Sequence, residues 1–134
     1  MISRTTFLRL LVLPVCFAGA ATAADLYVIC HPGVKLQSAD VRDMFLGERQ
    51  FAGSVMLQPA DNNAAQLLFL EKVLNMGPDR YATAWTKKSF RDGLNPPPVM
   101  GTDAEALEYV RRTSGACSYT STVPGPGVVL IETL

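Results

Sequence analysis

The pattern of apolar and polar positions divides the chain into alternating strands and helices. Residues 25–32, DLYVICHP, form an apolar, β-rich run that stops at a Pro-Gly pair, which predicts a strand buried on both faces. Residues 54–60, SVMLQPA, predict a second strand, and residues 116–120 and 128–133, ACSYT and VVLIET, predict two more. Because helical segments separate most of these strands, the pattern is typical of an α/β fold.

Apolar residues recur at helical spacing between the strands. Ser38 is expected to cap a first helix, which places Val41, Met44 and Phe45 on one face and ends at Gly47. Two further helices are predicted, one from about position 63 and one opened by the proline at position 78. Their expected inward-facing residues are Leu67, Leu70, Val73 and Leu74 in the second helix, and Tyr81, Ala82 and Trp85 in the third.

Residues 91–101, RDGLNPPPVMG, predict one long loop, since three successive prolines remove backbone donors and fix φ. We expect this loop to be ordered and to pack near Trp85. The row of Tyr81, Trp85 and Phe90 has two interpretations, a stacking platform for a ligand ring or, more commonly, part of the core. A final helix begins after the loop at a capping box formed by Thr102 and Glu105. The order of elements predicts a three-layer α/β sandwich on a small mixed sheet.

The N-terminus has the composition of an export signal. Arg4 and Arg9 lie at the start of an apolar run that ends in small residues, with A-T-A at 21–23. We therefore expect residues 1–23 to be a cleaved signal peptide, residues 24–134 to be one domain, and the mature protein to be periplasmic. Lipid attachment at Cys16 is the alternative, although the valine before it is bulkier than such processing favours.

The net charge argues against nucleic-acid binding, and the cysteine content indicates a disulfide. Removing residues 1–23 leaves 10 basic and 12 acidic residues, a net charge of 10 − 12 = −2, so no basic surface predicts nucleic-acid binding. Cys30 and Cys117 remain, and an even count in an exported domain is typical of a disulfide. His31 follows Cys30, but neighbours on a strand face opposite sides, and no further histidine exists to complete a metal site.

Several motifs, taken in order, resemble one family. The first is the opening strand, and the second is D-x-x-x-x-F-L-G at residues 40–47, followed by F-A-G-S-V-M-L-Q-P-A-D at 51–61. The third is F-x-x-x-V-L at residues 69–74, with Y-x-x-x-W at 81–85 after it. The fourth is F-R-D-G…P-P-P…V…G-A-C-S-Y, which lies within residues 90–119. Together they resemble the phosphate-binding substrate-binding proteins of ABC transporters, specifically short, single-lobe members. The resemblance covers nearly all of residues 25–134 and implies one lobe of a type II periplasmic binding protein.

The resemblance also implies where a ligand would bind, and there the chain departs from the family. The family holds its anion where the second strand meets its helix, with an Arg two positions before an Asp and a Ser-Gly-Thr two positions after it. Here Pro59 replaces the Arg, and the Asp is Asp61. The candidate weak ligand-binding residues are Asp61, Asn62, Asn63, Ala64 and Ala65. The plainer alternative is that residues 61–63 simply cap a helix.

The expected function is therefore binding without catalysis. The resemblance implies a periplasmic protein that binds a small oxyanion such as phosphate weakly, or that docks on a periplasmic or membrane protein. The alternative is a structural or assembly accessory that has lost ligand binding. No catalytic set, metal or cofactor is expected. The resemblance also implies antiparallel first and third strands, which would join Cys30 to Cys117, whereas two buried free thiols remain the alternative.

Overall fold

The computed structural model describes Pro14 and residues 25–134. The expected signal peptide, residues 1–23, therefore lies almost entirely outside the described residues. None of the helices in the described part of the chain has the length and hydrophobicity needed to span a bilayer.

Four strands form the main sheet, and helical segments connect them. In chain order the elements are β1 (Tyr27–Cys30), α1 (Ser38–Phe45), β2 (Phe51–Ala52), β3 (Val55–Met56), β4 (Gln58–Pro59), β5 (Asp61–Asn62), α2 (Gln66–Phe69), the π-helical segment η1 (Leu70–Leu74), α3 (Pro78–Asp92), β6 (Val99–Met100), α4 (Asp103–Arg112), β7 (Ala116–Thr120) and β8 (Val129–Thr133). The main sheet has the order β4-β7-β1-β8, while β2 pairs with β3 and β5 pairs with β6.

The main sheet is mixed, as the sequence predicts. β1 runs antiparallel to both β7 and β8, whereas β4 runs parallel to β7. The register of β1 and β7 places Cys30 directly opposite Cys117, and the two residues form a disulfide. Both the antiparallel placement and the Cys30–Cys117 bridge are therefore confirmed.

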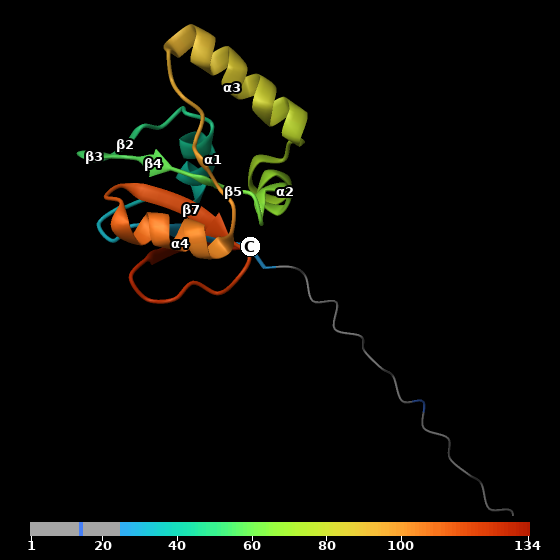
Figure 1. Ribbon diagram of the computed structural model, residues 1–134, viewed down its shortest axis with the longest axis vertical. Coiled ribbons are helices and arrows are strands. Elements are labelled where there is room, and N and C mark those ends of the chain that lie inside the picture. The colour runs from blue at the N-terminus through green and yellow to red at the C-terminus, as the bar shows by residue number, and fades with distance from the viewer. Residues whose placement is uncertain (1–13, 15–24) are drawn as a thin grey trace, which may run out of the picture.

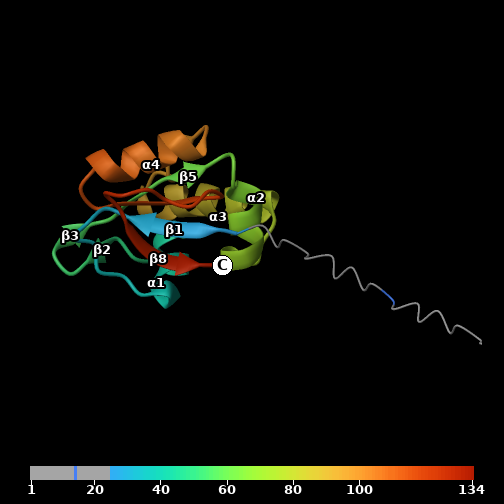
Figure 2. The same ribbon diagram turned by 90° about the horizontal axis from the view of Figure 1, so that it is seen from below.

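Helices lie on both sides of the main sheet. Figure 2 shows α4 on one side of β1 and β8 and α1 on the other, which gives the predicted three layers. In Figure 1, α3 lies on the same side of β7 as β4. The centre of the core is aromatic: the Phe69 and Tyr119 rings stack at a centroid distance of 4.0 Å, and Phe45 meets Phe69 at 4.6 Å. All three side chains are fully buried.

Two predicted boundaries are wrong. Ser38 is the first residue of α1 and not its cap, because the Asp40 carboxylate accepts a hydrogen bond from the Gln37 N–H and starts the helix one residue earlier. The predicted strand 54–60 divides into β3 and β4, which belong to different sheets. The division lies at Leu57, whose N–H donates to the Gln50 carbonyl and so closes the β2–β3 hairpin.

Three predicted inward-facing residues also differ. The second helix begins at Gln66 and continues as the wider η1 turns, so its buried face is Phe69, Leu70 and Leu74, while Leu67 is 70% exposed. In α3, Tyr81 and Trp85 are buried as expected, but Ala82 is exposed. Phe90, near the end of that helix, is 92% exposed and belongs to no core.

The proline-rich segment is shorter than predicted. Helix α3 continues through Asp92, and residues 99–100 form β6 against β5. The remaining loop ends with Pro98, whose carbonyl accepts a hydrogen bond from the Asp61 N–H at 2.8 Å. Pro97 is buried. Because its end pairs with a strand, the loop is fixed close to the candidate ligand residues.

Candidate functional site

The candidate residues 61–65 lie at a strand-to-helix junction, as the sequence predicts. Asp61 and Asn62 form β5, and α2 begins at Gln66 after a three-residue turn. Immediately upstream, Pro59 in β4 pairs with Cys117 in β7, next to the disulfide. This topology places the junction beside the sheet and next to the proline-rich loop.

The Asp61 carboxylate points into the protein. Its side chain is almost fully buried, and its two oxygens accept hydrogen bonds from the Tyr81 hydroxyl at 2.6 Å and the Tyr119 hydroxyl at 2.7 Å. Burial raises the pKa of Asp61, and the two tyrosine hydrogen bonds oppose that rise. Burial beside this carboxylate also raises the pKa of both tyrosines. The Asp61 carboxylate is therefore a buried acceptor that links α3 to β7.

The Asn62 side chain also makes its hydrogen bonds within the protein. Its Nδ2 donates to Asp103 Oδ1 at 2.7 Å and to the Tyr119 carbonyl at 2.9 Å, and its Oδ1 accepts from the Ala64 N–H at 3.0 Å. Asp103 also accepts from the Ser121 hydroxyl at 2.6 Å. Although partial burial raises the pKa of Asp103, the hydrogen bonds from Ser121 and Asn62 outweigh it and the pKa is lowered. The network ties the start of α4 to the junction.

The turn that follows has few donors left for a ligand. The Asn63 N–H donates to the Met100 carbonyl at 2.8 Å, and the Ala65 N–H donates to the Asn62 carbonyl at 3.1 Å. The Ala64 N–H is taken by the Asn62 side chain. Asn63 and Ala64 are exposed while Ala65 is buried. Among the five candidates, the exposed Asn63 side chain is the donor with the best access to a ligand, and anion binding at this junction stays a prediction.

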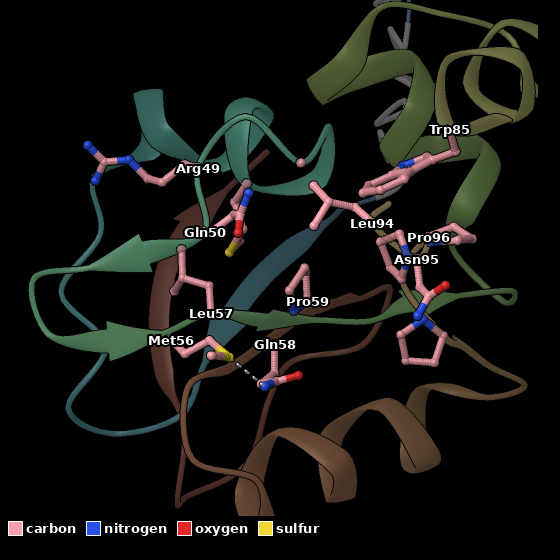
Figure 3. A pocket seen from close by; sticks show the side chains of 14 residues that line it. Arg49, Gln50, Met56, Leu57, Gln58, Pro59, Trp85, Leu94, Asn95 and Pro96 are labelled. Carbon is pink, nitrogen blue, oxygen red and sulfur yellow. Dashed lines mark hydrogen bonds between the residues drawn. The ribbon is translucent and has the colours of Figure 1, made fainter. Parts of the chain in front are cut away.

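A cavity of about 290 Å³ lies beside the junction, and sequence reasoning did not find it. Its walls are the end of α1 with the turn after it, the β3–β4 segment, and the proline-rich loop, with Trp85 at one end (Figure 3). Pro59 reaches into this cavity from β4. The only sequence signal for it was the prediction that the loop packs near Trp85.

Trp85 is rigidly positioned at the wall of this cavity. Its indole N–H donates to the Phe45 carbonyl at 3.1 Å, and its side chain is buried. Gly47 makes this possible, because a Cβ built at Gly47 would lie 2.8 Å from the Trp85 ring. Gly47 also has a positive φ of 72°, which favours glycine. The indole is therefore a fixed wall of the cavity.

A second cavity, of about 490 Å³, lies on the other side of the same segment. It shares Trp85, Pro96 and Pro97 with the first cavity and is also lined by Asp61 and the exposed Phe90. The predicted row of Tyr81, Trp85 and Phe90 thus separates into two buried core residues and one exposed rim residue. The expectation that the row is part of the core is correct for Tyr81 and Trp85 and wrong for Phe90.

The His31–Cys30 pair does not form a reactive site. Cys30 is bonded to Cys117, and His31 Nδ1 lies 2.9 Å from the Val110 carbonyl. Within the part of the chain that the structure describes, no three His, Cys, Asp or Glu side chains are grouped to hold a metal ion.

The order of the proline-rich loop gives a testable result. We expect a broad-specificity protease to cleave the native protein slowly between Gly93 and Gly101, because Pro97 is buried and the loop ends in β6. The largely exposed segment 121–127 is an internal control that should be cut first. Limited proteolysis with mass spectrometry identifies the sites, and faster cleavage at 93–101 than at 121–127 would contradict the packing of this loop.

Comparison with known proteins supports the fold. No protein-family profile and no curated protein sequence matches this chain. Among solved structures, it is similar to PstS from Borrelia burgdorferi, with a TM-score of 0.52 and 14% sequence identity over 72% of this chain. The similarity spans 40% of the PstS chain. At this identity the likeness concerns the fold alone, and this chain has a mixed α/β fold like that of a PstS lobe.

Proposed function

We propose that this chain is a non-enzymatic periplasmic protein of the solute-binding type, a short, single-lobe relative of the phosphate-binding proteins of ABC transporters. It binds a small oxyanion weakly or docks on a periplasmic or membrane protein. The observation that carries the proposal is the fold shared with PstS, together with a strand-to-helix junction at residues 61–65. The motifs that resemble the phosphate-binding family support the same proposal.

The geometry at the junction supports weak binding over tight binding. Pro59 replaces the family's Arg and offers neither a charge nor an N–H, while Asp61 and Asn62 already hold internal partners. Tight anion binding depends on charge-assisted hydrogen bonds, which this junction lacks. A small anion would meet the exposed Asn63 side chain, because the N–H groups of residues 63–65 already have internal partners.

The first test is phosphate affinity. We expect a Kd no better than about 1 mM, since about 4 kcal/mol of binding free energy is all that a few neutral hydrogen bonds would supply. Calorimetry on the purified chain measures the affinity, with sulfate and chloride as matched anions. Micromolar phosphate binding would contradict the proposed weak site.

The alternative is a structural or assembly accessory without any ligand, and the internal use of Asp61 and Asn62 favours it. Thermal unfolding with a panel of oxyanions separates the two functions. A ligand at 100 times its Kd raises the free energy of unfolding by about 2.7 kcal/mol, so even weak binding raises the melting temperature at high concentration. If no anion raises it, the weak-binding proposal fails and the accessory function remains.

A further inference from the structure

The cavity beside Trp85 has the features of a small-molecule site. It is concave and largely apolar, since Leu57, Pro59, Leu94 and Trp85 contribute to its walls. Two walls, residues 44–50 and 56–59, are joined by the β2–β3 hairpin, and the third, residues 94–98, is distant from both in sequence. Its volume of about 290 Å³ is just below the range for ligand pockets, which is roughly 300 to 1,000 Å³. A small organic molecule fits this volume better than a helix or a folded partner.

The lining also indicates the charge of the occupant. Among the residues that line the cavity, Arg49 alone is charged. In Figure 3 the Arg49 guanidinium points away from the cavity, and it lies 3.6 Å from the Asp40 carboxylate. A charged ligand group would lose its hydration without gaining an opposite charge, which is costly. The cavity therefore disfavours both anions and cations.

Neutral polar groups are present instead. Gln50, Gln58 and Asn95 bring amide groups to the lining. Gln58 Nε2 contacts the Met56 sulfur at 3.5 Å, while the Gln50 and Asn95 amides make no hydrogen bond within residues 25–134. Amides on two facing segments offer donors and acceptors to a ligand, and Trp85 with the prolines offers a rigid apolar surface that loses little entropy on binding.

We infer that the cavity between α1, β4 and the proline-rich loop binds a small, uncharged, ring-containing molecule. The rings pack against Trp85 and Pro59, and the amides of Gln50 and Asn95 bind a polar substituent. This site is separate from residues 61–65, so the inference does not depend on anion binding at the junction.

The single tryptophan of the chain makes the inference directly measurable. Phenylnaphthylamine is an uncharged fluorescent molecule that accepts energy from tryptophan, and anilinonaphthalene sulfonate has the same ring system with an added anionic group. In titrations of the full chain, we expect saturable energy transfer from Trp85 to phenylnaphthylamine at one site per chain. We expect the sulfonated molecule to bind at least about tenfold more weakly, because its charge finds no partner in the cavity.

Matched variants assign the site. Gln50→Tyr and Asn95→Tyr each place a ring in this cavity from opposite walls, at exposed positions where the fold tolerates change. Gln66→Tyr makes the same kind of change in the neighbouring cavity, which shares Trp85. We expect the first two variants to weaken phenylnaphthylamine binding by about tenfold or more, and Gln66→Tyr to leave it within about twofold.

The remaining outcomes overturn the inference. No saturable energy transfer to phenylnaphthylamine means that the cavity takes no such ligand. Equal or tighter binding of the sulfonated molecule contradicts the uncharged class. Loss of binding in Gln66→Tyr moves the site to the neighbouring cavity. Because phosphate calorimetry and energy transfer to phenylnaphthylamine use different ligands and different readouts, the failure of the anion proposal and the failure of this inference are distinguishable.

Discussion

Replacing Cys30 and Cys117 together with alanine is expected to lower the free energy of unfolding by about 4 to 5 kcal/mol. The bridge closes a long loop, since the two cysteines are 87 residues apart in sequence. In the chain-entropy description, such a cross-link reduces the conformational freedom of the unfolded chain by this amount. Both residues are fully buried in adjacent strands, so the alanine variant also leaves a small void that adds to the loss.

Urea unfolding of the protein with and without reductant measures this effect. Reductant should move the wild type towards the stability of the double variant and leave the variant unchanged, which provides the control. Alkylation of the unreduced protein, followed by mass spectrometry, gives an independent result. Alkylation of both Cys30 and Cys117 in the unreduced protein, or equal stability of wild type and variant, would contradict a structural role for the bridge.

Removing the Tyr119 hydroxyl should also weaken the fold strongly. In Tyr119→Phe, one oxygen of the buried Asp61 carboxylate loses its donor, while the ring keeps its packing against Phe69. A buried acceptor without a partner costs about 1 to 3 kcal/mol, and more when it is charged. We therefore expect a loss of this size in the free energy of unfolding at neutral pH.

The loss of unfolding free energy in Tyr119→Phe should increase as the pH rises. The pKa of Asp61 is raised in the folded protein, so the folded state binds a proton more readily than the unfolded state. The contribution of this group to stability is therefore complete below its ordinary pKa, about pH 4, and is lost as pH rises through the raised pKa. Tyr119→Phe should increase this loss, because the hydrogen bond from Tyr119 lowers the pKa of Asp61.

Chemical unfolding at a series of pH values above about pH 4 checks both parts of the prediction. Tyr109→Phe is the matched control, since the Tyr109 hydroxyl makes only a longer, exposed hydrogen bond of 3.3 Å to the Gln58 carbonyl. It should change stability by no more than about 0.5 kcal/mol. Asp61→Asn keeps an acceptor for one tyrosine and removes the charge, so it should flatten the pH dependence. Equal losses in Tyr119→Phe and Tyr109→Phe would refute the role given to Asp61.

Local signals predicted much of the fold. Residues 116–120 form a strand with the predicted bounds, and Thr102 caps α4 by accepting the Glu105 N–H. These elements could be predicted because strand alternation, capping residues and helix-opening prolines are signals contained within a few neighbouring residues. The Cys30–Cys117 bridge was also predicted, but its support came from the resemblance to a family, which supplied the strand direction.

The sequence did not reveal that Asp61 and Asn62 face inward. Polar residues at a helix start have the same local pattern whether they meet solvent, a ligand or the interior. The distinction depends on Tyr81, Tyr119 and Asp103, which lie 20 to 58 residues away along the chain. Packing of α3 and β7 around the junction supplies these partners, and no property of residues 61–65 alone specifies them.

The sequence by itself therefore determined the kind of fold, most of its helices and the position of the strand-to-helix junction, because these depend on local periodicity and capping. Tertiary structure alone decided which residues of the junction and the loop are buried and which partners they contact. It turned Asp61 towards two tyrosines, exposed Leu67 and Phe90, and brought Gln50, Pro59 and Asn95 around one cavity. The physical reason is that burial and hydrogen-bond partners are set by contacts between distant segments, which no short stretch of sequence contains.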